Sequence, residues 1–410
     1  MYKNTFNWVE PIELAAAVDK TGSDFVFLYS SLLTSYSGRY SYIAYSPSKV
    51  LMDALDLERQ YGRWFGYLAY EAFDQKKYDL KSYITMPKVM MMQCDSVIVF
   101  DHQERKVYSN LSHLPLPSIV MKNNVRVKDL FSNMTRSEYC QNIEDTLAAI
   151  VRGDFYQANI TRKFYGTVND DYDAFSIFSN LCHVSPAPYG AFLKVGNYRV
   201  ISSSPEMFIR LSADGIAENN LIKGTARRFN DPKEDEISRL SLQNSEKDKS
   251  ENIMIVDLMR NDFARGSYCD SIEVNNLYKI YSYKAVHHAL STIRSKKLKD
   301  ISSLQFIKGC FPAGSITGAP KIQVRKWCRE IEKWERGIYT GSIGWFDSDG
   351  SLDLSVVIRT LIMEGNKFEF QVGGGIVYES EPEKELEETL TKASAIAAVL
   401  GIDVDRLRAL

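Results

Sequence analysis

The 410-residue chain has no hydrophobic run of membrane-spanning length, and its first residues do not show the pattern of a signal peptide. A membrane helix needs about 20 consecutive apolar residues, and no run in this sequence approaches that length. The first residues, MYKNTFNWVEPIELAAAV, have no apolar core of the kind that a signal peptide carries. These absences predict a soluble, cytoplasmic protein with no membrane partner.

Cysteine, histidine and net charge are also scarce. The six cysteines are scattered without a C-x-x-C pair, which indicates buried or free thiols in a reducing compartment. No histidine and cysteine cluster offers a site for a soft metal. The net charge of −2 argues against a non-specific nucleic-acid binder. With 45% hydrophobic and 25% charged residues, the composition is that of an ordinary globular protein.

No Gly/Ser-rich or Pro-rich linker divides the chain, although its length would allow two or three domains. A surface connection is indicated by LPLPS at 114–118 and by the basic stretch 121–128. We therefore predict one compact body with a soft boundary, between an N-terminal subdomain of mixed strands and short helices (1–125) and a larger region (126–410).

Local signals are clear in several places. Phe25–Tyr29 is rich in aromatic and β-branched residues and predicts a strand. Gly196-Asn197 between two apolar runs predicts a hairpin. Thr135 and Glu138 have the spacing of a capping box, and Gly153 stands where a helix-ending residue belongs, so a helix is expected between them.

One lysine stands in an unusual setting. Lys223 lies between aliphatic residues and a glycine in the stretch Leu221–Thr225. Burial removes water from an ammonium group, so this setting predicts a lowered lysine pKa and a nucleophilic amine. A strand-end lysine that reaches water is the alternative that these five residues leave open.

Two expected helices begin with acidic pairs. Asp248 and Glu251 lead into IMIVDLMRND, and Glu385 and Glu388 begin the helix expected over Glu385–Leu400. Residues three apart share a helix face, and paired carboxylates suit a hard cation such as Mg²⁺. Charges that complement the helix dipole are the alternative.

Glycine-rich segments accompany these helices. The three glycines Gly373–Gly375 weaken a strand unless something must approach its backbone, which favours a binding site. The segment Gly314–Lys321 is not a nucleotide phosphate loop, because Ala319-Pro320 interrupts the motif and Ile322 replaces its hydroxyl residue. A turn of this kind can still present N–H groups to a carboxylate.

Two further candidates are weaker. Glu206 follows a Ser-Ser-Ser-Pro strand end and is a candidate for a carboxyl group with a raised pKa that donates a proton. The pair His287-His288 lies in an apolar context, where core or surface packing is the alternative to a functional role.

The chain resembles the chorismate-utilising enzymes in five motifs that occur in the same order: IKGTARR, ENIMIVDLMRND, GSITGAPK, GSIGWFD and GGGIVYESEPEKELEET. This family includes anthranilate synthase component I, aminodeoxychorismate synthase component I, isochorismate synthase and salicylate synthase. The match is close over 130–400 and looser over the first 125 residues. The resemblance implies an α+β fold of two large, mainly antiparallel sheets packed together with helices outside.

The resemblance also implies a Mg²⁺ site between the two acidic helices that holds the ring carboxylate of chorismate. Glu251 and Glu388 would be direct ligands, with Asp248 and Glu385 bridged by water. Arg359 would pair with the enolpyruvyl carboxylate, for which a bidentate fork is suited. The remaining expected site residues are the catalytic Lys223, Glu206 and His288 and the substrate-binding Gly373, Gly374, Gly375, Thr225, Ser315 and Trp345.

Two positions indicate which member of this family the chain resembles. Gln157 stands where water-adding members of the family carry a lysine, which disfavours isochorismate and salicylate synthases. Lys223 replaces an alanine of anthranilate synthases, as in aminodeoxychorismate synthases. The resemblance therefore implies Mg-dependent amination of chorismate at C4, through a covalent Lys223 intermediate, to 4-amino-4-deoxychorismate, the precursor of 4-aminobenzoate and folate. Anthranilate synthase component I and a non-catalytic chorismate-binding subunit are the alternatives.

The 410 residues carry no glutaminase signature of the G-x-C-x-G kind. We therefore expect free ammonia or a separate glutamine amidotransferase subunit to supply nitrogen, and a separate lyase to form 4-aminobenzoate. Some relatives bind a regulatory tryptophan with a Leu-Leu-Glu-Ser segment. Leu28–Ser31 matches that segment without its acidic residue, which argues against tryptophan feedback.

Overall fold

A computed structural model of the chain describes residues 4–34, 37–58, 60–76, 78–282 and 286–410. Its strands are β1 (Asn4–Asn7), β2 (Phe25–Tyr29), β3 (Tyr40–Leu51), β4 (Trp64–Leu68), β5 (Val89–Asp101), β6 (Lys106–Ser109), β7 (Val127–Ser132), β8 (Gln157–Val168), β9 (Tyr189–Val195), β10 (Tyr198–Ser204), β11 (Met207–Leu211), β12 (Ile216–Arg227), β13 (Glu273–Ser282), β14 (Val286–Lys296), β15 (Gly318–Ala319), β16 (Ser342–Phe346), β17 (Leu352–Val356), β18 (Thr360–Glu364) and β19 (Lys367–Ile376).

The helices of the described residues are α1 (Pro11–Lys20), α2 (Ala54–Leu57), α3 (Arg136–Arg152), α4 (Ala174–Val184), α5 (Pro232–Gln243), α6 (Glu246–Ala264), α7 (Ser303–Cys310), α8 (Lys321–Glu332), α9 (Pro382–Leu400) and α10 (Val404–Arg408). Two 3₁₀ turns, η1 (Cys269–Ser271) and η2 (Gly314–Ile316), complete the set. None of the described helices combines the length and the apolar composition that crossing a membrane requires.

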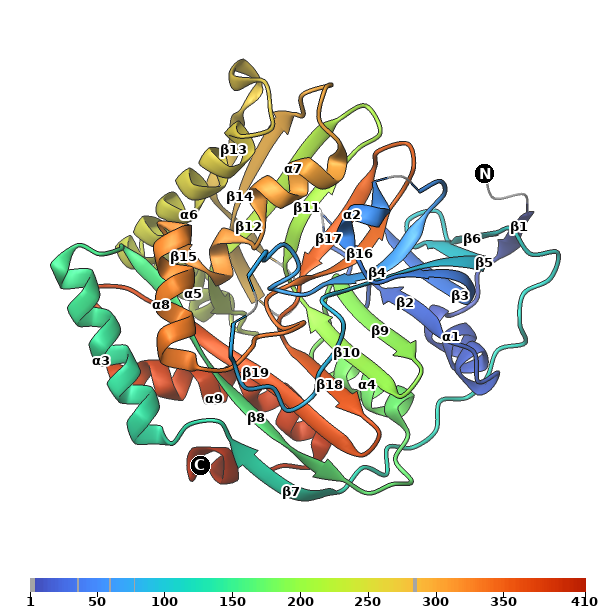
Figure 1. Cartoon of the computed structure of the whole chain (residues 1–410), viewed down its shortest axis with the longest axis horizontal. Helices are drawn as coiled ribbons and strands as arrows, with labels where there is room; N and C mark the ends of the chain where they lie inside the picture. The colour runs from blue at the N-terminus through green and yellow to red at the C-terminus, as the bar shows by residue number, and fades with distance from the viewer. Residues whose placement is uncertain (1–3, 35–36, 59, 77, 283–285) are drawn as a thin grey trace.

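The strands form two large antiparallel arms (Figure 1). The first arm has the order β3–β2–β9–β10–β18–β19–β8–β7. The second has the order β5–β4–β16–β17–β11–β12–β14–β13. These arms confirm the expected α+β fold with two large antiparallel sheets. The two sheets are also continuous, because β3 and β5 pair with each other at ten positions.

A shared apolar core joins the two arms. Val26 and Leu193 from the first arm and Phe65 and Ile343 from the second belong to one buried cluster. Burying an aliphatic or aromatic side chain of this size contributes about 1.5–3 kcal/mol, so the contact between the arms is a principal source of stability.

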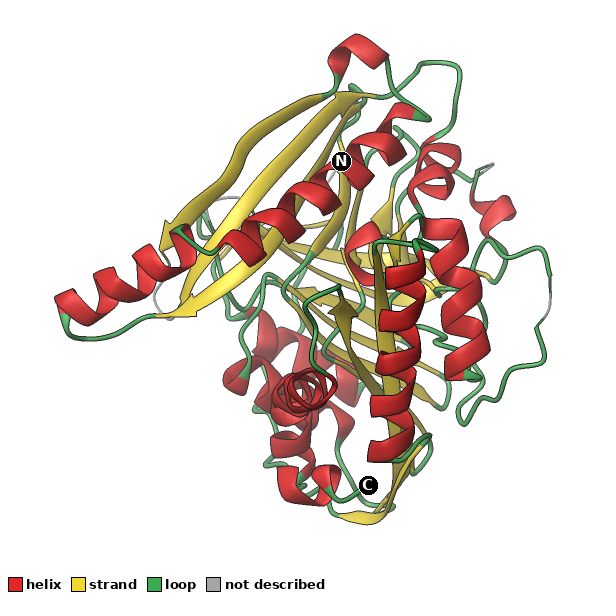
Figure 2. Ribbon diagram, turned by 90° about the vertical axis from the view of Figure 1, so that its left-hand side faces the viewer, coloured by secondary structure: helices red, strands yellow, loops and turns green. Residues whose placement is uncertain are grey.

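Helices cover the outer faces of the sheets (Figure 2). On the first arm, Phe178 of α4 and Ile396 of α9 share a buried cluster with strand residues. On the second arm, Phe263 of α6 and Phe306 of α7 pack with their ring centroids 5.5 Å apart. The sheets and the outer helices therefore place α6 and α9 at the site described below.

The local predictions are confirmed at several elements. Thr135 and Glu138 form both hydrogen bonds of a capping box at the start of α3, and Gly153 ends that helix with φ of 84°. The expected hairpin joins β9 to β10 through Gly196, which has φ of 51°. The expected strand at Phe25–Tyr29 is β2.

Strands from both sides of the proposed boundary near residue 125 pair directly. β2 lies beside β9, and β4 lies beside β16. The division into a region 1–125 and a region 126–410 stays a prediction, and hydrogen bonds between strands cross it at two places.

Candidate active site

The glycine strand brings the two acidic helices together. A Cβ atom on Gly374 would lie 2.9 Å from Glu385 Oε2 and 3.9 Å from Glu388 Oε1 on α9. A Cβ atom on Gly375 would lie 3.5 Å from Glu251 Oε1 on α6. A side chain at Gly374 would crowd Glu385, and the end of β19 forms the floor of an acidic site.

Lys223 enters this site from β12. Its Nζ atom donates a hydrogen bond of 2.5 Å to Glu251 Oε1. Burial alone would lower the pKa of Lys223, but Glu251 and, more weakly, Glu206 and Glu388 stabilise its charge, so its pKa is raised. The expectation of a lowered lysine pKa is therefore wrong for this arrangement, because the surrounding carboxylates together stabilise the ammonium by more than burial destabilises it.

Lys392 is a functional candidate that the sequence analysis missed. It lies one turn after Glu388 on α9, with Nζ 2.6 Å from Glu388 Oε1 and 2.8 Å from the carbonyl oxygen of Gly373. Its charge favours the ionised forms of Glu206 and Glu251 and so acts against the rise that burial causes in the pKa of each. The available signal was the i, i+4 spacing of Glu388 and Lys392 on one helix face.

Glu206 and Ser315 are brought together from distant parts of the sequence. Ser315 Oγ donates to Glu206 Oε1 at 2.5 Å. Burial raises the pKa of Glu206, opposed by the hydrogen bond from Ser315 and by the charges of Lys223 and Lys392. A carboxyl group with a raised pKa can hold a proton and give it to a leaving group.

His288 and Thr225 are opposite one another on β14 and β12. His288 Nδ1 lies 2.9 Å from Thr225 Oγ1. The neighbouring His287 is on the other face of the strand, where its ring nitrogens lie 3.2 Å from Asp235 Oδ1 and 2.8 Å from Ser282 Oγ. Of the two histidines, only His288 therefore shares the strand face of Thr225.

Arg359 lies close enough to influence His288 electrostatically. It adopts the left-handed backbone conformation, with φ of 51°, and its Nη1 lies 3.4 Å from Ser185 Oγ. Arg359 is an exposed residue, but the protein around its guanidinium displaces water and lowers its pKa, which still leaves the group charged at neutral pH. The side chain can therefore offer a positive fork to an anionic ligand.

We expect His288 to remain neutral between pH 5 and pH 8. Burial and the nearby charge of Arg359 lower its pKa to about 4, and a neutral ring is therefore the dominant form above that value. A proton NMR titration should show no shift of the His288 ring signals across this range, with His288→Gln used for assignment. A midpoint near 6.5, the ordinary histidine value, would contradict the environment described here.

Gln157, at the start of β8, also faces the acidic site. Its Nε2 donates to Glu251 Oε1 at 3.2 Å, and the same atom lies 2.3 Å from the position of a Cβ on Gly375. Its Oε1 is buried and has no hydrogen-bond partner among the residues that the structure describes. Buried amide oxygens usually have a partner, so this acceptor is open to a ligand.

The carboxylates suit a hard divalent cation in kind. Burial and the charge of Glu388 raise the pKa of Glu385, whose Oε1 accepts a 2.7 Å hydrogen bond from Ser380. Asp248 is at the start of α6, and its Cβ lies 3.4 Å from the position that a Cβ on Gly224 would occupy. Crowded carboxylate oxygens of this type are the ligands that Mg²⁺ prefers. Within the described ranges no three acidic, histidine or cysteine side chains converge as a preformed metal site, and Glu251 and Glu388 are each paired with a lysine.

Trp345 does not join these residues. It shares a face of β16 with Ile343, which packs in the core between the sheets. The Arg63 guanidinium lies 4.2 Å from its ring centroid, and the ring of Tyr42 lies 6.0 Å away. The expectation that Trp345 binds the substrate is not supported, because the alternation of side chains along β16 turns it toward a different cavity.

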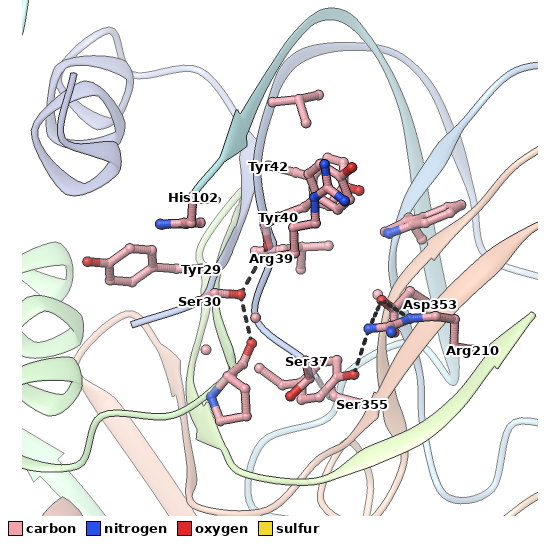
Figure 3. Close-up of a pocket in the computed structure, with 18 of the residues that line it drawn as sticks. Tyr29, Ser30, Ser37, Arg39, Tyr40, Tyr42, His102, Arg210, Asp353 and Ser355 are labelled. Carbon is pink, nitrogen blue, oxygen red and sulfur yellow. Dashed lines mark hydrogen bonds and ion pairs between the residues drawn. The ribbon is translucent and has the colours of Figure 1, made fainter. Parts of the chain in front are cut away.

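This second cavity lies between the sheets and has a volume of about 1130 Å³ (Figure 3). Ion pairs of 2.8 Å between Arg39 and Asp101 and 3.0 Å between Arg210 and Asp353 stand on its walls. Leu28, Tyr29 and Ser30 also line it. The absence of tryptophan feedback, expected from this segment, stays a prediction.

With this geometry established, comparison with known proteins decides the family. Residues 39–398 match the family described as chorismate binding enzyme. The chain belongs to this family. The chorismate binding enzymes most similar in sequence include aminodeoxychorismate synthase component 1 of Escherichia coli K12, which is 34% identical over 81% of this chain and 75% of its own length. Anthranilate synthase component 1 of Saccharolobus solfataricus is 31% identical over 90% of this chain and 91% of its own length.

Higher identity occurs in longer proteins. The probable chloroplastic aminodeoxychorismate synthase of Oryza sativa is 38% identical over 69% of this chain, but the match spans only 32% of its own length. The chain thus spans about a third of the length of the first curated relatives that it matches. Among solved structures, anthranilate synthase component I of Streptococcus pneumoniae TIGR4 has a TM-score of 0.78 at 24% identity, with 90% of this chain and 94% of that one covered. This likeness shows that the family fold is present.

Proposed function

We propose that this chorismate binding enzyme aminates chorismate at C4 and forms 4-amino-4-deoxychorismate. The observation that carries the proposal is the amine of Lys223, which lies 2.5 Å from Glu251 at an acidic site floored by glycines. The relatives named aminodeoxychorismate synthase support the choice of substrate and product.

Glu251 and Glu388 are the residues proposed to hold Mg²⁺ directly, with Asp248 and Glu385 behind bridging water. A cation there would bind the ring carboxylate of chorismate and withdraw electrons from the ring. Lys223 acts as a nucleophile only as the neutral amine. Its deprotonation would require that Glu251, if it held the cation, stabilise the Lys223 ammonium less than it does at 2.5 Å.

Lys223 and Glu206 carry the proposed first step. The amine of Lys223 attacks C2, the two conjugated double bonds of the ring both shift, and the C4–O bond breaks. The hydroxyl group leaves as water with the proton of Glu206, whose raised pKa suits a general acid. Arg359 and the neutral His288 are proposed to orient the substrate, the former through the enolpyruvyl carboxylate.

The second step reverses the displacement. Ammonia attacks C4, both ring double bonds shift back, and the C2–N bond to Lys223 breaks with return of a proton to the amine. The open acceptor Gln157 Oε1 is available to an N–H group at this stage. Two successive displacements need a nucleophilic side chain at position 223, which an alanine would not supply.

The nitrogen source and the next reaction require other proteins. Component 1 in the names of the bacterial relatives supports a separate component that supplies ammonia, proposed to be a glutamine amidotransferase. A separate lyase would convert the product to 4-aminobenzoate for folate synthesis, and the cytoplasm is the proposed compartment. Ammonium, and not glutamine alone, is the nitrogen source expected for the isolated chain.

Anthranilate synthase is the second candidate, because one such relative matches this chain over 91% of its own length. That reaction places the amino group at C2 and releases pyruvate. Lys223 distinguishes the two candidates, since its amine would occupy C2 during amination at C4. A non-catalytic chorismate-binding subunit is the remaining alternative. In that case calorimetry would detect chorismate binding, but neither product would form.

The covalent step can be tested by trapping. The chain is incubated with chorismate and Mg²⁺ without ammonium, quenched in acid and analysed by intact mass and peptide mapping. We expect an adduct of chorismate less one water on the peptide that contains Lys223, lost when ammonium is added. Lys223→Arg keeps the charge and should form no adduct. Turnover with ammonium but no adduct under any quench would contradict the covalent route.

A further inference from the structure

The loop that carries Ser315 is fixed at its C-terminal end. Lys321 Nζ donates to Asp262 Oδ2 at 2.6 Å and to the carbonyl oxygen of Cys310 at 2.7 Å, which ties the loop to α6 and α7. Gly318 pairs with Ala158 on β8. These contacts hold the loop but do not reach the backbone beside Ser315.

That backbone is held by two buried side chains. The carbonyl oxygen of Ile316 accepts hydrogen bonds of 3.0 Å from Arg336 Nη1 and of 3.0 Å from Asn159 Nδ2. Arg336 Nη2 also donates to the carbonyl oxygen of Asn159 at 2.6 Å. Arg336 thus spans the loop and β8, and both donors meet at the residue that follows Ser315.

Arg336 is itself held rigidly. Its Nε and Nη2 donate to Glu332 Oε2 and Oε1 at 3.0 and 2.7 Å, and its side chain is 2% exposed. Glu332 Oε1 also accepts from the backbone N–H of Thr161 at 3.0 Å. Burial alone would lower the pKa of Arg336, but Glu332 together with Tyr70 and Cys328 raises that pKa. A planar guanidinium can meet a carboxylate and two carbonyls at once, whereas a lysine ammonium has no such fork.

We propose that Arg336 and Asn159 are positioning residues that fix the Ile316 carbonyl, and through it Ser315, so that Ser315 holds the Glu206 carboxyl toward the leaving hydroxyl group. The proposal rests on the proposed function, in which Glu206 gives up the proton. Ser315 and Ile316 are adjacent, so a change of the carbonyl position moves the hydroxyl group that lies 2.5 Å from Glu206. Errors of about 1 Å in such an arrangement can cost about 100-fold in rate.

The test compares Asn159→Ala, Arg336→Lys and Ser315→Ala in the full chain. Asn159→Ala removes one donor and leaves the Arg336 pair with Glu332 intact, so it should fold even if Arg336→Lys does not. We expect each variant to lower kcat on the order of 10-fold with a smaller change in KM. Burial raises the pKa of Glu206, and the hydrogen bond from Ser315 opposes that rise. Each variant weakens this hydrogen bond, so the pKa of Glu206 should rise further. Because Glu206 acts in its protonated form, the fall of kcat at basic pH should then occur at higher pH. Lys223 and Lys392, the charged groups that face Glu206, are unchanged in all three.

A double-mutant cycle separates positioning from general stability. Asn159→Ala combined with Ser315→Ala should be no slower than Ser315→Ala alone, because both changes act on one hydrogen bond. The matched control is Asn169→Ala, a buried asparagine that accepts from Arg126 N and donates to Asp171 Oδ1, both at 2.6 Å. Asn169→Ala should lower the free energy of unfolding without moving the basic limb of the kcat profile. Additive losses in the cycle, or an unmoved limb in Asn159→Ala, would overturn the proposal.

A measurement that does not depend on turnover distinguishes the proposed amination of chorismate from the proposed positioning role. Infrared spectroscopy detects protonated carboxyl groups, and the band that is absent from the Glu206→Gln spectrum is assigned to Glu206. The intensity of this band is followed as a function of pH in the wild type, Asn159→Ala and Ser315→Ala. We expect its midpoint to rise in both variants and to stay in place in Asn169→Ala. A wild type that does not aminate chorismate would contradict the proposed function, whereas a midpoint unmoved in Asn159→Ala would contradict the positioning role.

Discussion

Lys223→Ala is expected to fold and to lose chorismate amination by on the order of 10³-fold or more, because the first step loses its nucleophile. The side chain projects from β12 toward Glu251 and carries no part of the apolar core. Its removal should therefore leave the circular dichroism spectrum and cooperative unfolding in place. Steady-state rates with saturating chorismate, Mg²⁺ and ammonium measure the loss.

Lys223→Arg is the control that separates charge from nucleophilicity. It keeps a cation beside Glu251 but has no free amine, so it should be as inactive as Lys223→Ala. If either variant retains the wild-type rate of amination, the covalent mechanism is wrong. An intermediate rate in Lys223→Arg alone would assign Lys223 an electrostatic role instead.

Glu251→Gln is expected to abolish Mg²⁺-dependent turnover, with a loss on the order of 10²–10³-fold. Glu251 is the carboxylate that meets both Lys223 Nζ and Gln157 Nε2, and it lies at the floor formed by Gly375. The amide keeps the shape but not the charge, so calorimetry should show weakened Mg²⁺ binding in the presence of chorismate.

Asp257→Asn is the matched control on the same helix. Asp257 is six residues after Glu251 on α6, with an exposed side chain paired to Arg260 at 3.2 Å. Its replacement should leave both turnover and Mg²⁺ dependence unchanged. Undiminished turnover in Glu251→Gln would remove this residue from the proposed ligands.

The sequence was informative wherever the signal was local. The capping box at Thr135, the ending glycine Gly153 and the turn at Gly196 are set by a few neighbouring residues, and each forms as expected. The three glycines Gly373–Gly375 also carried a readable signal, since glycines in a strand imply a close approach. In the structure Gly374 lies against carboxylates of α9 and Gly375 against Gln157 and the Glu251 carboxylate of α6, whereas Gly373 packs against the backbone of β8.

Long-range contacts account for what the sequence could not show. The pKa of Lys223 depends on a carboxylate that α6 brings across from another element, and this reverses the direction expected from burial alone. Trp345 belongs to a motif of the family, but strand alternation turns it into the cavity between the sheets. Arg336 and Asn159 are 177 residues apart, so no local pattern indicates that they meet.

Identification of the product formed from chorismate, Mg²⁺ and ammonium tests the central claim most directly. Mass and fluorescence are recorded on the purified chain's reaction, with and without an added lyase. The account predicts a non-fluorescent aminated chorismate that becomes 4-aminobenzoate only when the lyase is present. Immediate formation of fluorescent 2-aminobenzoate with release of pyruvate would contradict it and would assign the chain to anthranilate synthesis.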